Sequence, residues 1–235
     1  MPVSGSVPES GSVPESGSVS VSASSLVRPA WAALAWLAAM TVLATAGVFV
    51  PAPYAPPVAL AVAAALPPLL AVAAMTGSDR ARAWVAGLDL RVLTLLQMWR
   101  VAGFAFLPLW VSGVIPGRFA APAGLGDVAV ALTAPLVAFG LVGRSAGWFR
   151  AWTAFGIADL VIAVTLGVLH SWSPIGALTG TGPDTQPVTE LPLVLIPTFG
   201  VPFCLVLHVL SLAHPAQGAP DQASSGRVSA VTQER

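Results

Sequence analysis

Two charged side chains lie deep inside long apolar stretches of this 235-residue chain. Arg100 occurs in QMWRVAGF and Asp159 in GIADLVIAV. By helical rise, they lie roughly 10 Å and roughly 12 Å from the same end of their predicted helices. An unpaired charge in an apolar medium is costly, so opposite charges at similar depth are expected to meet. We therefore predict an ion pair between Arg100 and Asp159.

The chemistry of such a pair leaves three interpretations open. Gln97 lies one turn before Arg100 and could join the pair to form a polar pocket. The simplest interpretation is a neutralised pair that fixes how the helices pack. Alternatively, Arg100 could extend to lipid headgroups and leave Asp159 neutral. A third interpretation is a site that binds an anion, a proton or a polar headgroup.

A further carboxylate, Asp127, ends the sequence GLGD. This sequence resembles the GxGD signature of intramembrane aspartyl proteases, in which two facing aspartates activate a water molecule. In those enzymes the partner aspartate precedes the signature, whereas Asp159 follows it. Asp127 is also expected to enter from the opposite face, so the two depths should not converge.

We interpret Asp127 instead as a helix cap. Gly124 and Gly126 would let the chain turn into a membrane. Asp127 would then lie at the amino terminus of a helix and accept hydrogen bonds from its free amides. Arg118 lies on the same face and could pair with it.

The last apolar stretch, LPLVLIPTFGVPFCLVLH, contains Pro197, Gly200 and Pro202. An interior proline removes a hydrogen bond and clashes one turn back, which predicts a kink or break near mid-depth. Broken helices expose backbone groups to substrate in secondary transporters. Proline is also common in membrane helices for packing reasons, so the break alone does not decide the function.

No pattern in the sequence is typical of a metal or cofactor site. Cys204 is the only cysteine, which excludes an internal disulfide and a multi-cysteine metal cage. His170 and His208 are expected near opposite ends of their helices, too far apart to share a metal. Nucleotide-binding loops and Ser/His/Asp patterns are absent. We therefore expect neither a cofactor nor enzymatic activity.

The composition indicates a protein whose solvent is largely lipid. Apolar residues make up 56% and charged residues 9% of the chain, whereas soluble domains contain about 25% charged residues. The formal net charge is zero, which argues against nucleic acid as a partner. The expected partners are the lipid bilayer and either another membrane protein or a second copy of this chain.

Six apolar stretches are long enough to cross a bilayer, which takes about 20 helical residues. Because backbone groups in lipid must pair within their own helix, we predict an all-α, polytopic transmembrane helix bundle over residues 28–213. The expected spans are about 30–50, 57–76, 93–114, 125–143, 151–170 and 191–213. Residues 84–92 are expected either to form a short interfacial helix or to extend the third span.

The arginines predict the orientation, because basic residues gather on the cytoplasmic side of membrane proteins. Only Arg118 falls on the opposite face. The arginines expected on the cytoplasmic side are Arg28, Arg80, Arg82, Arg144, Arg150 and Arg227. Both termini are therefore predicted to be cytoplasmic. Residues 1–27, which repeat SGSVPE, and the polar residues 214–235 are expected to be disordered.

Four segments resemble those of uncharacterised bacterial multi-pass membrane proteins. They are QMWR (97–100), FLPLWVSGVIPGRFAAPAGLGD (106–127), GIADLVIAVTLG (156–167) and LPLVLIPTFGVPFCLVLH (191–208). The resemblance covers roughly residues 92–212 and implies no activity. It implies that the PAGLGD segment, Arg100 and Asp159 belong to a shared pattern.

These observations favour a non-catalytic scaffold or partner subunit of the bacterial cytoplasmic membrane. The first alternative is a small secondary transporter or ligand-binding protein with a polar pocket at Arg100 and Asp159. The less favoured alternative is an intramembrane aspartyl protease that uses Asp127. The first three spans show no convincing similarity to the last three, whereas many transporters contain inverted repeats.

Overall fold

Helices account for all the regular structure in the part of the chain that the computed structural model describes, which is residues 23–52, 55–171 and 182–215. The predicted all-α helical bundle is confirmed. Of the segments expected to be disordered, residues 1–22 and 216–235 lie outside the described residues. Residues 23–27 belong instead to the first helix, and His214 is buried, with its Nε2 3.0 Å from the Leu88 carbonyl oxygen.

Six helical stretches are long and apolar enough to cross a membrane. Each is close to the length that a bilayer requires. The elements that form them are α1 (Ala23–Thr45), α2 (Val58–Gly77), the run of α4 (Leu90–Leu95), η1 (Leu96–Ala105) and α5 (Phe106–Val111), then α6 (Gly117–Gly140), α7 (Ala146–Leu169), and η3 (Ile196–Gly200) with α8 (Val201–Ala213). The short elements α3 (Asp79–Ala86) and η2 (Gln186–Thr189) lie between them.

The fourth helix differs most from its expected bounds, because α6 begins at Gly117 rather than near residue 125. The turn into this helix is made earlier, where Gly113 has a φ of 71° and Pro116 is the N-cap residue. The glycines of GLGD are therefore helical and do not form the turn. The separate helix α3 accounts for part of the segment 84–92 whose structure was ambiguous from the sequence.

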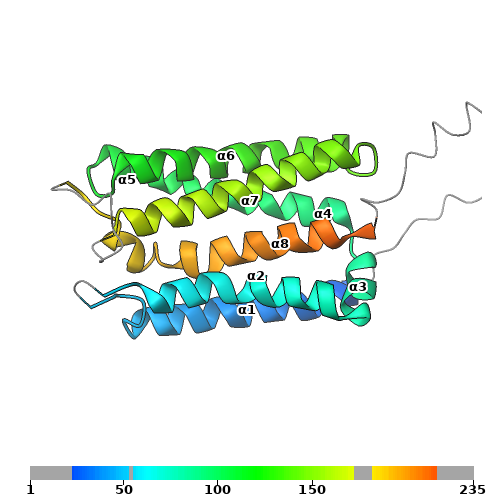
Figure 1. Ribbon diagram of the computed structural model, residues 1–235, viewed down its shortest axis with the longest axis horizontal. Coiled ribbons are helices and arrows are strands. Elements are labelled where there is room, and N and C mark those ends of the chain that lie inside the picture. The colour runs from blue at the N-terminus through cyan, green and yellow to red at the C-terminus, as the bar shows by residue number, and fades with distance from the viewer. Residues whose placement is uncertain (1–22, 53–54, 172–181, 216–235) are drawn as a thin grey trace, which may run out of the picture.

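The helices lie side by side in a bundle (Figure 1). In this view α1 and α2 form one edge, α6 forms the opposite edge, and α7 and α8 lie between them. The described part of α1 begins, and α8 ends, at the end of the bundle that carries α3, and α5 lies near the opposite end. We call these two ends the α3 end and the α5 end.

Two of the four apolar clusters among the described residues lie at different levels of the interior. The one toward the α3 end includes Leu93, Phe149 and Leu207. The other, toward the α5 end, includes Phe106 and Phe119, whose rings meet edge to face with centroids 5.2 Å apart. The polar side chains described below lie between these clusters.

Two of the six stretches depart from regular α-helix. The middle of the third is a ten-residue 3₁₀ helix, η1, which is long for this helix type. The last begins with a five-residue π-helix, η3, that contains Pro197 and Gly200, and Pro202 follows at the start of α8. The predicted break is therefore present. It lies at the α5 end of the stretch rather than at mid-depth, because residues 191–194 form turns and the stretch begins at Ile196.

Candidate functional site

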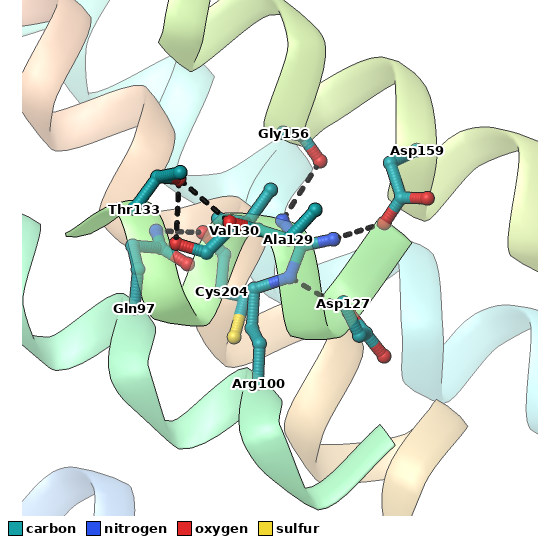
Figure 2. A network of polar contacts seen from close by, with 9 residues as sticks. All are labelled: Gln97, Arg100, Asp127, Ala129, Val130, Thr133, Gly156, Asp159 and Cys204. Carbon is teal, nitrogen blue, oxygen red and sulfur yellow. Dashed lines mark hydrogen bonds and ion pairs between the residues drawn. The ribbon is translucent and has the colours of Figure 1, made fainter. Parts of the chain in front are cut away.

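One guanidinium group connects three helical segments in the interior of the bundle (Figure 2). Arg100, on η1, donates from Nε to Oδ1 of Asp127 on α6 at 2.7 Å. Its Nη1 donates to the backbone carbonyl oxygen of Gly156 on α7 at 3.0 Å, and its Nη2 donates to Oδ2 of Asp159, also on α7. We call Arg100, Asp127, Asp159 and the Gly156 carbonyl the Arg100 cluster. The predicted contact between Arg100 and Asp159 is present.

The cluster is almost closed to solvent. The Arg100 side chain is 1% exposed, and those of Asp127 and Asp159 are 11% and 10% exposed. With both carboxylates ionised, one guanidinium faces two negative groups, so the cluster has a formal charge of −1. Its three bonds use the planar fork that distinguishes arginine from lysine.

The helix-cap interpretation of Asp127 is wrong. Asp127 lies well inside α6, whose N-cap residue is Pro116. The exposed Arg118 lies at the start of the same helix, and Asp127 pairs with Arg100 instead. The error came from treating Gly124 and Gly126 as a turn. In the structure they are helical residues that permit close packing.

Three glycines make room for the charged groups. A Cβ atom on Gly103 would overlap Asp127, and one on Gly126 would overlap the Asp159 carboxylate. A Cβ atom on Gly156 would lie too close to the His208 ring and 3.2 Å from Nη1 of Arg100. The GLGD sequence is thus a packing feature, in which glycine brings the helices close enough for the carboxylates to reach one guanidinium.

Gln97 lies on the same face of η1 as Arg100 but does not join its ion pairs. In a 3₁₀ helix side chains three residues apart eclipse one another, and Gln97, Arg100 and Gly103 are all buried. The Gln97 amide donates from Nε2 to the Cys204 carbonyl oxygen on α8 at 3.2 Å. Gln97 therefore ties η1 to a fourth element, α8.

His208 is a buried neighbour of the cluster that the sequence interpretation did not include. It lies on α8, is 1% exposed, and meets the Trp152 ring edge to face. Its Nε2 and the Oε1 of Gln97 are buried without a hydrogen-bond partner among the described residues. His208 follows Cys204 by one helical turn, which could have indicated a shared face. Within the same ranges, no group of three or more His, Cys, Asp or Glu side chains is arranged to hold a metal ion.

The depths of the two aspartates converge, contrary to the argument made from the sequence. Asp127 and Asp159 both contact Arg100. The arrangement still differs from a catalytic aspartate pair, because the group between the carboxylates is a guanidinium rather than a water molecule.

Comparison with known proteins identifies the family. Residues 57–214 match a domain of unknown function, DUF8737, so the chain belongs to this family. The match begins next to α2 and ends after α8, and it contains all members of the Arg100 cluster. No curated protein and no solved structure matches the chain.

Neutralising Arg100 should be more harmful than neutralising either aspartate. Arg100→Gln leaves two carboxylates without their cation, and breaking a buried pair in this way costs about 3–5 kcal/mol. Asp159→Asn leaves a neutral pair of Arg100 and Asp127, so we expect a loss of about 1–2 kcal/mol. The measurement is the unfolding free energy of the purified protein in detergent.

Two controls accompany this comparison. Arg82→Gln removes an arginine from an exposed ion pair with Asp79 and should cost less than about 1 kcal/mol. Arg100→Gln combined with Asp127→Asn and Asp159→Asn should be more stable than Arg100→Gln alone. Equal losses for Arg100→Gln and Asp159→Asn would contradict the charge balance assigned to the cluster.

Gly126→Ala should destabilise the bundle by about 1–3 kcal/mol, the usual cost of overpacking. The added methyl group would overlap the Asp159 carboxylate. Gly140→Ala on the same helix is the matched control, because a Cβ atom there meets nothing within 4 Å. Thermal unfolding in detergent checks both variants, and equal melting temperatures would show that the contact between Gly126 and Asp159 is not tight.

Proposed function

We propose that this member of the DUF8737 family is a non-catalytic multi-pass protein of the bacterial cytoplasmic membrane that serves as a scaffold or partner subunit. The observation that carries the proposal is the Arg100 cluster. Its guanidinium is committed to bonds with α6 and α7. A buried charge used in this way fixes the relative positions of helices.

The outer surface of the bundle supports a lipid bilayer as its main partner. Large apolar side chains are exposed along the helices, as at Leu132, Leu136 and Phe139 on α6. An apolar surface of this extent is unfavourable in water, whereas it matches the hydrocarbon core of a membrane.

The distribution of arginines supports a cytoplasmic α3 end. Arg118 begins α6 at the α5 end. Arginines on helices or turns at the α3 end are Arg28, Arg80, Arg82, Arg91, Arg144 and Arg150. By the positive-inside rule, the α3 end and with it both termini face the cytoplasm. Arg227, which was counted for the same side, lies outside the described residues.

The geometry of the aspartates supports a non-enzymatic role. An aspartyl protease needs a water molecule held between two carboxylates that share a proton. In this protein Nε of Arg100 is 2.7 Å from Oδ1 of Asp127, and the same guanidinium contacts Asp159. Both groups are therefore engaged by a cation in the position that a catalytic water would need.

A small secondary transporter is the second candidate function. It is favoured by a cavity of about 260 Å³ that Asp127 borders, since a carboxylate beside an internal cavity is a common feature of substrate and proton pathways. A transporter would need this carboxylate to change partners during its cycle, whereas a scaffold would keep the Arg100 cluster closed.

Reporter fusions test the proposed orientation. Alkaline phosphatase inserted after Pro116 in the turn before α6 should be active, because it would lie outside the cytoplasm. Green fluorescent protein fused after residue 235 should fluoresce, because it would lie inside. The opposite pattern would reverse the orientation inferred from the arginines.

Asp159→Asn separates the scaffold from the transporter. For a scaffold we expect the variant to lower the amount of protein in the membrane several-fold, because one contact to Arg100 is lost. Wild-type proteoliposomes should then carry no proton flux above empty liposomes, measured with a trapped pH-sensitive dye. A wild-type flux that disappears in Asp159→Asn at matched protein content would overturn the scaffold role in favour of transport.

A further inference from the structure

The cavity beside the Arg100 cluster is lined mainly by apolar side chains. Its volume is about 260 Å³, which is slightly below the usual range of drug-sized sites and suits a fragment-sized molecule. The apolar lining comes from α2, α5, α6, α7, η2, η3 and α8. Its principal members are Phe106, Phe119, Leu160, Ala163, Val164 and Val201. The cavity also reaches the exposed residues Ala52 and Gln186, so it opens toward the α5 end.

Among the described residues that line this cavity, Asp127 is the one that has a charged side chain. Its Oδ1 accepts the bond from Nε of Arg100, and its Oδ2 accepts no hydrogen bond from the described residues. In Figure 2 one oxygen of Asp127 is turned toward Arg100 and the other away from it. Asp127 therefore borders the cavity as a carboxylate that has bonding capacity left over beside its contact with Arg100.

The charge of the cluster determines which ligand suits this carboxylate. With both carboxylates ionised, Asp127 and Asp159 carry one more negative charge than the Arg100 guanidinium that contacts them can neutralise. An uncompensated charge in an apolar interior is unfavourable, so the site favours a ligand that brings a positive charge. An anion would add to the excess, and a purely apolar molecule would leave it unchanged.

We propose that the cavity binds a small organic cation, namely an ammonium group attached to a compact apolar body. The ammonium donates to the Asp127 carboxylate, and the apolar body lies against Phe119, Leu160 and Ala163. Three features of the site carry the assignment: its size, its apolar lining and its single bordering carboxylate with an excess of negative charge. This binding site goes beyond the scaffold role and does not depend on it.

The test uses the full chain in lipid nanodiscs and radiolabelled 2-phenylethylammonium as the probe. Equilibrium dialysis measures its binding, with empty nanodiscs as the background. Neutral 2-phenylethanol and anionic 3-phenylpropionate are the matched comparisons. We expect saturable binding of the ammonium that is at least about tenfold tighter than that of the alcohol, as a charge-assisted hydrogen bond provides, and no saturable binding of the anion.

Replacing either of two native alanines on α7 by phenylalanine locates the site without altering a residue of the Arg100 cluster. Ala163→Phe fills the cavity and should weaken ammonium binding at least about tenfold. Ala154→Phe adds the same side chain at an exposed position of the same helix and should leave binding unchanged. Both variants must give a monodisperse protein of normal melting temperature. If Ala163→Phe does not, Ala163→Leu replaces it under the same criterion.

Three results would overturn the proposal. Equal affinities for the ammonium and the alcohol would show that the cavity accepts apolar molecules, such as acyl chains, and that a proton neutralises the excess charge. Unchanged binding in the cavity-filling variant would place the probe elsewhere. Absence of saturable binding in the wild-type protein would remove the site altogether. None of these results bears on the scaffold role, which the membrane abundance and proton flux of Asp159→Asn test separately.

Discussion

The buried Arg100 guanidinium must find all its hydrogen-bond partners within the protein. This requirement explains how the helices around it are arranged. The side chain is 1% exposed, and leaving it without partners would cost several times the net stability of a typical hydrogen bond. Two carboxylates and a backbone carbonyl meet the requirement. They come from α6 and α7, so these contacts tie η1 to both helices in the observed register. Apolar clusters lie on either side of these polar groups, one toward each end of the bundle.

Small residues allow the helices to approach closely enough for these contacts. The contacts to Arg100 require backbones closer than ordinary side chains allow, and the sequence supplies glycine where a carboxylate or ring needs the space, at Gly103, Gly126 and Gly156. In the membrane setting proposed above, helix association gains little from the hydrophobic effect, so close packing and polar contacts would provide most of its stability. Glycine and charge therefore act together here, since the ion pairs would not form between helices held apart by larger residues.

Much of the architecture could be predicted because long apolar helices and isolated charges follow simple rules. Length and hydropathy identified the six helical stretches, and the cost of isolated charges predicted the contact between Arg100 and Asp159. The position of Asp127 was missed because glycine was judged by its behaviour in turns, whereas in this bundle it permits close approach. The spacing of His208 and Cys204 indicates a shared face, but the sequence does not say that this face is turned toward Arg100, because the face that a helix buries depends on its neighbours. The 3₁₀ geometry of η1 has no known signal in a single sequence and arises from tertiary contacts.

That 3₁₀ segment sets a limit on how the third span can move. Its ten residues rise about 2.0 Å each, whereas α-helical residues rise about 1.5 Å, so the segment is about 5 Å longer than its α-helical equivalent. Rewinding it as α-helix would draw the ends of the span together by that amount and turn each residue back by about 20° relative to the one before. Gln97 and Gly103 would then swing to opposite sides of Arg100, away from α8 and Asp127. The extended form of this segment is therefore what lets Gln97 reach the Cys204 carbonyl oxygen and Gly103 lie against Asp127 on the same face as Arg100.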